Sequence, residues 1–188
     1  MTIDYLHNHV EFNDFISTIA VEMSIDPYMV EKDYWIMHCL HELSLLDIKI
    51  EFKGGTSLSK AYKILNRFSE DLDLAITIDE NIIGFEVKTG KNQDKPKHVE
   101  SRKKFFDFLP SFFSGKIHGI NSIERDTSFD DIPKYRNGGI LVTYPTLFEN
   151  TEGVKDGVLL ELGFGGTTPN EEKEISSWAY DEWLTRSS

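Results

Sequence analysis

The chain has 188 residues, a length that predicts one domain around a single hydrophobic core. Its 32 acidic residues against 20 basic ones give a net charge of −12, which argues against a module that binds DNA by general phosphate neutralisation. One cysteine excludes an internal disulfide, no apolar run approaches the roughly 20 residues of a membrane span, and the first residues lack a signal-peptide pattern. We therefore expect a cytoplasmic protein that has no membrane partner.

Apolar periodicity indicates helices in the first quarter of the chain, and Asp26-Pro27 is typical of a helix start. Apolar and charged residues alternate from Ile48 onward, which is the period of a half-buried strand. In chain order we predict helices over 5–23 and 27–46, a strand over 48–53, a short helix over 57–65, a strand over 71–77, a helix over 99–113 that breaks or bends at Pro110, and strands over 115–124, 139–144 and 157–164.

Helices come first in this order, and strands mixed with helices follow. The order predicts an α+β fold with a mixed β-sheet and flanking helices. We expect the single domain 1–188 to consist of N-terminal helices over 1–46, a sheet core over 47–168 and, over 169–188, the start of a C-terminal region.

Gly54 and Gly55 end a predicted strand, and Thr56 and Ser57 open a predicted helix. Glycine lets the backbone approach a phosphate closely, and a helix N-terminus offers unpaired N–H groups to it. The two hydroxyls add donors, and Lys60 lies about one turn further on, within reach of a triphosphate. A plain chain reversal with a hydroxyl N-cap is the more common use of such a sequence, so the bend alone does not establish a phosphate site.

Asp71 and Asp73 are two residues apart in a predicted strand, so their carboxylates share one face. A divalent cation relieves their repulsion, and hard carboxylate oxygens suit Mg²⁺. A solvated strand face is the alternative, and the neighbouring glycine bend favours the metal site. Glu161 interrupts an apolar run and is a third candidate ligand, although an edge strand that turns Glu161 toward water explains that run equally well.

Three segments resemble the AbiEii/AbiGii-type nucleotidyltransferase toxin family, within the DNA polymerase β-type nucleotidyltransferase superfamily. They are EKDYWI at 31–36, FKGGTSLSK at 52–60 and RFSEDLDL at 67–74, and Leu160-Glu161-Leu162 followed by Pro169 is similar to the family's third-carboxylate region. The resemblance spans about 27–178. It implies a mixed-sheet nucleotidyltransferase core, Mg²⁺ or Mn²⁺ as cofactor, and transfer of a nucleoside monophosphate from a nucleoside triphosphate to a hydroxyl of an RNA, possibly a tRNA, or of a protein.

The same resemblance implies a role for each candidate site residue. Asp71, Asp73 and Glu161 are the implied catalytic carboxylates and metal ligands. The residues implied to bind the nucleotide are Gly54, Gly55, Thr56, Ser57, Lys60 and Ser69.

The resemblance also implies the toxin of a toxin–antitoxin or abortive-infection pair, and hence a cognate antitoxin as partner. Longer relatives carry a further helical region with an additional lysine and aspartate, which has no counterpart in the sequence up to Ser188. The alternative is therefore a catalytically impaired domain of the same fold that binds nucleotide or antitoxin. A third alternative is an α+β interaction protein in which Asp71 and Asp73 are solvated surface.

Lys32 and Asp33 stand side by side in the second predicted helix, next to Tyr34 and Trp35. We expect them to form an ion pair on the helix surface while the aromatic residues enter the core. The resemblance favours a Lys32 that faces the cleft, without assigning it a chemical step.

Overall fold

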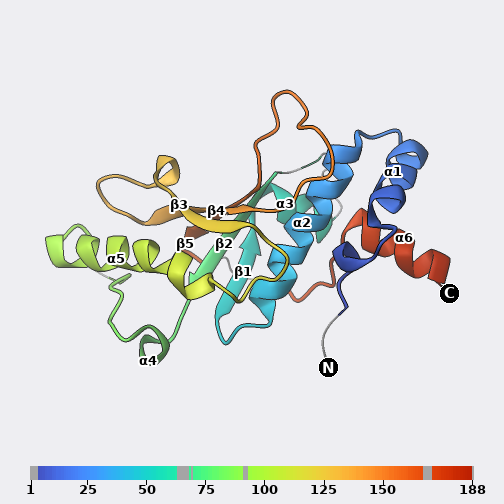
Figure 1. Cartoon of the computed structure of the whole chain (residues 1–188). Coiled ribbons are helices and arrows are strands. Elements are labelled where there is room, and N and C mark those ends of the chain that lie inside the picture. Colours follow the sequence, from blue (N-terminus) through green and yellow to red (C-terminus); the bar gives the residue numbers. More distant parts are fainter. Residues whose placement is uncertain (1–3, 63–67, 69, 91–92, 167–170, 188) are drawn as a thin grey trace.

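The computed structural model describes residues 4–62, 68, 70–90, 93–166 and 171–187. Of Thr56 and Ser187 it describes only the backbone. Figure 1 shows helices packed around one sheet. In chain order the elements are η1 (Leu6–Asn8), α1 (Phe12–Met23), α2 (Pro27–Ser44), β1 (Lys49–Lys53), α3 (Gly54–Lys60), β2 (Asp71–Thr77), α4 (Glu80–Ile83), α5 (Pro96–Phe113), β3 (Ser122–Asp126), η2 (Thr127–Phe129), β4 (Asn137–Thr143), β5 (Val158–Gly163) and α6 (Trp178–Ser187).

The five strands form one sheet in the order β1-β2-β5-β4-β3. Strands β2 and β5 are parallel, and the other three neighbouring pairs are antiparallel. Helix α2 contacts β2 and β5, and α5 contacts β3 and β4. The predicted α+β fold with a mixed sheet and flanking helices is confirmed.

Helix α2 is the central helix of the molecule. Its start is capped as expected, because the Asp26 side chain accepts a hydrogen bond from the Tyr28 N–H at 2.9 Å and Pro27 occupies the first turn. The helix lies between the sheet on one side and α1 and α6 on the other (Figure 1), and every residue from Val30 to Leu40 is buried. Charged side chains on such a buried helix need hydrogen-bond or ion-pair partners from the surrounding elements.

Several predicted boundaries are wrong for local reasons. The strand predicted over 115–124 is found at Ser122–Asp126, because Gly115 and Gly119 adopt positive φ angles of 72° and 73° and form turns. Helix α5 starts at Pro96 and continues through Pro110 to Phe113, so the predicted break is absent; buried Phe113 anchors its last turn. The first long helix begins at Phe12 rather than near Tyr5.

Two helices, α4 and α6, were not predicted. Helix α6 packs against α1 and α2, so its stability depends on tertiary contacts that a local sequence pattern does not reveal.

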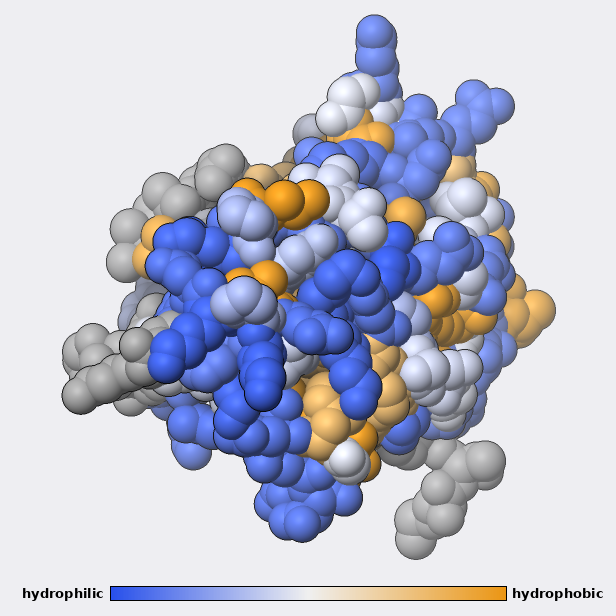
Figure 2. Space-filling view, turned by 90° about the vertical axis from the view of Figure 1, so that its left-hand side faces the viewer, coloured by the Kyte–Doolittle hydropathy of each residue, from blue (hydrophilic) through white to orange (hydrophobic). Residues whose placement is uncertain are grey.

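Figure 2 shows the face at the α5 end, where hydrophilic side chains predominate and apolar groups form small separate patches. Within the described ranges, no helix is long and apolar enough to span a membrane.

Candidate active site

Three carboxylates lie on one face of the central strands. Asp73 of β2 and Glu161 of β5 are direct partners in the parallel register. Leu72 and every second residue after it in β2 point into the core and are buried. Because side chains alternate between the two faces of a strand, Asp71, Asp73 and Glu161 lie on the opposite face, where all three are half-buried. Strand β5 lies between β2 and β4, so the edge-strand explanation of Glu161 is wrong.

Asp71 and Asp73 lie close enough to Glu161 to perturb its carboxyl group. Burial, and after it the charges of Asp71 and Asp73, raises the pKa of the Glu161 carboxyl. Burial also raises the pKa of Asp71, while Lys155 is the strongest cation that opposes this shift. The pKa shifts therefore indicate a local excess of negative charge, which a cation would relieve.

The donor set fits a hard divalent cation. All three candidate ligands offer carboxylate oxygens, and Mg²⁺ typically takes one or two carboxylates and completes its shell with water and substrate phosphates. Among the residues that the structure describes, no group of three or more His, Cys, Asp or Glu side chains is drawn together closely enough to hold a metal ion unaided.

The glycine bend lies directly against the second aspartate. Gly54 has a φ of 72°, and a Cβ built on it would stand 2.7 Å from Oδ2 and 2.8 Å from Cβ of Asp73. Only glycine combines this left-handed backbone with so close an approach. The bend and the carboxylates are therefore parts of one site.

The residues after the bend form the first turn of α3. The helix begins at Gly54 rather than at Ser57, with Lys53 at the N-cap position. Thr56 and Ser57 consequently lie inside the helix, and the alternative in which a hydroxyl residue caps it is wrong. Ser69 lies outside the described residues.

Two lysines that sequence analysis missed flank the carboxylates. The Lys53 amino group is 3.3 Å from Oδ1 of Asp73, its partner across β1 and β2. Burial raises the pKa values of both Asp71 and Glu161, and the charge of Lys155, in the connection between β4 and β5, opposes this rise. Lys53 directly precedes Gly54 in the sequence, which was the available signal; Lys155 had none, because the chain fold alone brings it there.

Lys60 points toward α2. Its amino group is 2.5 Å from Oδ1 of Asp33 and 4.6 Å from the ring centroid of Trp178. The nucleotide contact predicted for Lys60 stays a prediction, and the ion pair gives this residue a second, structural partner.

A groove of about 1700 Å³ runs along β1 and α3 from the bend. Lys53, Gly54, Ser57 and Lys60 contribute to its wall, as do Trp178 and other residues of the segment before and within α6. The bend therefore borders a groove large enough for a nucleotide, although Asp71, Asp73 and Glu161 do not line that groove.

Comparison with known proteins identifies the family. The family model described as nucleotidyl transferase AbiEii toxin, type IV toxin–antitoxin system, matches residues 36–186. The chain belongs to the AbiEii family. The match contains the bend, all three carboxylates and Lys155, and it begins within α2, after Lys32 and Asp33. No curated protein matches the chain.

One solved structure similar to this AbiEii-family chain is MenT4, a nucleotidyltransferase toxin from Mycobacterium tuberculosis. The identity is 15% and the TM-score 0.37, and the alignment covers 92% of this chain and 45% of MenT4. The chain thus spans less than half the length of MenT4.

Proposed function

We propose that this AbiEii-family protein is a Mg²⁺- or Mn²⁺-dependent nucleotidyltransferase. It transfers a nucleoside monophosphate from a nucleoside triphosphate to a hydroxyl of an RNA, with tRNA as a candidate, or to a hydroxyl of a protein. The observation that carries the proposal is the contact of Gly54 with Asp73, whose register partner is Glu161. A backbone bend suited to phosphate and a carboxylate pair suited to a cation thereby meet at one point.

In the proposed reaction, the acceptor oxygen forms a bond to the α-phosphorus while the bond from that phosphorus to the bridging oxygen breaks and pyrophosphate leaves. Asp71, Asp73 and Glu161 would hold the metal, which supplies charge stabilisation to the attacking and leaving oxygens when bound. Glu161 would also favour deprotonation of the acceptor hydroxyl.

The glycine bend and helix α3 are proposed to bind the triphosphate group of the nucleotide. Backbone N–H groups from Gly54 to Ser57 would bind the β- and γ-phosphates, with the hydroxyls of Thr56 and Ser57 as further donors and Ser69 as a predicted one. Lys60 is proposed to reduce the charge on the leaving pyrophosphate, and Lys53 is the nearest cation to the bend that the structure adds.

The proposed biological setting is a toxin that a cognate antitoxin restrains, acting in the cytoplasm. The family description supports the toxin assignment.

The test is transfer of label from each of the four nucleoside triphosphates to total RNA by the purified chain with Mg²⁺. Asp71→Asn and Asp73→Asn should abolish transfer while far-UV circular dichroism stays unchanged. Retained transfer in either variant would overturn the mechanism. Nucleotide binding without transfer by the wild type would favour the impaired binding domain.

A further inference from the structure

Three consecutive charged residues of α2 are completely enclosed. Glu31, Lys32 and Asp33 are 0%, 1% and 1% exposed, respectively. Charges removed from water in this way cost several kcal/mol each unless partners compensate them. Neighbours in a helix point in different directions, so the partners come from different elements and the surface ion pair expected between Lys32 and Asp33 is wrong.

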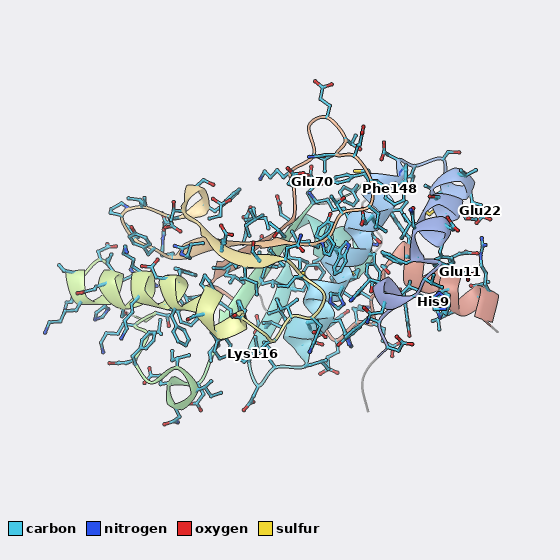
Figure 3. The ribbon with its side chains drawn as sticks, in the orientation of Figure 1. His9, Glu11, Glu22, Glu70, Lys116 and Phe148 are labelled. Carbon is cyan, nitrogen blue, oxygen red and sulfur yellow. The ribbon has the colours of Figure 1, made fainter. Side chains whose placement is uncertain are left out.

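Lys32 joins the starts of the two strands that carry the carboxylates. Its amino group donates to Oε2 of Glu70 at 3.3 Å and to the carbonyl of Lys155, and the same Glu70 oxygen accepts the Lys155 N–H at 2.9 Å. Glu70 directly precedes Asp71, and Lys155 lies three residues before β5. Figure 3 labels Glu70, beside the connection between β4 and β5.

These hydrogen bonds hold the starts of β2 and β5 from the face of the sheet that packs on α2. By strand alternation Glu70 continues the row of Leu72 and Leu74, which faces α2, whereas Asp71 faces the site. Asp71 is also among the charges that oppose the lowering of the Lys32 pKa by burial. Lys32 thus sets the position of Asp71 without occupying the site itself.

Asp33 holds the helix of the glycine bend. Its Oδ1 pairs with the Lys60 amino group at 2.5 Å, and its Oδ2 accepts the Trp178 N–H at 2.9 Å. Lys60 is the last residue of α3, and Gly54, which contacts Asp73, is the first. Helix α3 has seven residues, so its two ends are about two turns apart.

We infer that Lys32 and Asp33 are positioning residues that each hold a different half of the site: Lys32 fixes the carboxylate strands, and Asp33 fixes the phosphate-binding helix. The inference rests on the proposed function. Because the two residues are adjacent in one buried helix, α2 sets the distance between the proposed metal ligands and the N-terminus of α3, where the triphosphate is proposed to bind. Substitution of Lys32 should therefore impair metal binding alone, and substitution of Asp33 should impair nucleotide binding alone.

The experiment compares Lys32→Met, which removes the charge and keeps the length, with Asp33→Asn, which is nearly isosteric. Lys32→Met should raise the Mg²⁺ concentration for half-maximal transfer by about 10–100-fold, as loss of a residue behind a metal ligand does, with the KM for nucleoside triphosphate little changed at saturating Mg²⁺. Asp33→Asn should raise that KM by up to about 100-fold through a displaced cradle and leave the Mg²⁺ dependence close to wild type.

A second readout does not depend on catalysis. Melting temperatures are measured with Mg²⁺ alone and with Mg²⁺ plus a non-hydrolysable ATP or GTP analogue, since a ligand that binds only the folded state raises the melting point. Lys32→Met should lose the shift caused by Mg²⁺ alone, and Asp33→Asn should lose the additional shift caused by the analogue. Exposed Lys104→Met in α5 and exposed Asp14→Asn in α1 are the matched controls and should behave as wild type.

Glu70→Gln provides the same test if Lys32→Met does not fold. It should reproduce the Mg²⁺ phenotype, and the double variant Lys32→Met/Glu70→Gln should be no worse than either single one, because both changes break the same link. Equal changes in Mg²⁺ dependence and KM in the Lys32 and Asp33 variants would overturn the inference. A wild type that is stabilised by both ligands but transfers nothing would refute the proposed function alone, whereas no response of the wild type to either ligand would refute both.

Discussion

Gly54 and Asp73 are in contact across the candidate site: a Cβ on Gly54 would stand 2.7 Å from Oδ2 of Asp73. The contact joins a backbone that offers N–H groups to a carboxylate that offers metal-binding oxygens. Any side chain at position 54 would push these two apart, so the geometry of the site depends on a hydrogen atom at that position.

Gly54→Ala should lower transfer by about 100-fold, because the methyl group displaces either the bend or Asp73. The positive φ of 72° adds backbone strain of about 1–2 kcal/mol. Gly84→Ala is the matched control, since Gly84 has a φ of 76° with nothing within 4 Å of its added Cβ. Gly84→Ala should lower the free energy of unfolding measured in urea, because of the backbone strain, but its nucleotide transfer should equal that of the wild type. Comparable loss of transfer in both variants would mean that strain, rather than the contact with Asp73, is responsible.

Lys53→Met should raise the KM for nucleoside triphosphate about tenfold. The change removes the amino group 3.3 Å from Asp73 and leaves the three carboxylates with less positive charge to balance the incoming phosphates. Lys104→Met removes an exposed lysine from α5, which does not line the groove, and should leave the KM unchanged. Steady-state kinetics at saturating Mg²⁺ measures both. An equal effect of the two substitutions would indicate a general charge effect and contradict a specific role for Lys53.

Glu161→Gln should raise the melting temperature of the metal-free protein at pH 7 by a few degrees. The folded-state pKa of Glu161 is raised, so its carboxylate costs stability once the pH exceeds the ordinary glutamate value, and this cost is absent below that value. The gain should therefore disappear as the pH falls below about 4.5. Differential scanning calorimetry in chelator at pH 7 and pH 4 tests the sign, and a variant less stable than wild type at pH 7 would contradict it.

The same variant should respond less to Mg²⁺. In the wild type a bound cation relieves the repulsion among Asp71, Asp73 and Glu161, so Mg²⁺ should raise the melting temperature more in the wild type than in Glu161→Gln. An equal response would place the cation elsewhere.

Arg102→Met should destabilise the fold by about 3 kcal/mol without changing the KM of the folded protein. The Arg102 side chain is 1% exposed and donates to the carbonyls of Lys88, Gln93, Lys134 and Tyr135, so its loss leaves several acceptors unpaired. Lys103→Met, at the surface of the same helix, should cost about 0.5 kcal/mol or less. Chemical denaturation gives both values. A small effect of Arg102→Met would show that water replaces these hydrogen bonds.

Much of the catalytic strand could be predicted from local patterns. Period-2 alternation over 71–77 places Asp71 and Asp73 on one face because side-chain direction in a strand is a local property. The bend at Gly54 is equally local, and the N-cap at Asp26 predicted the start of α2 to the residue. The starts of α3 and β3 were misplaced because the backbone angles of individual glycines, rather than the hydrophobic period, decide where these two elements begin.

The sequence by itself determined which carboxylate, hydroxyl and glycine residues stand close together along the chain, since residue type and short-range spacing are local properties. Only the tertiary structure decided that Glu161 lies on a central strand beside Asp73, that Lys53 and Lys155 flank the carboxylates, and that Lys32 and Asp33 are buried anchors. Strand order, register and burial arise from contacts between segments far apart in the chain, and no local period encodes them.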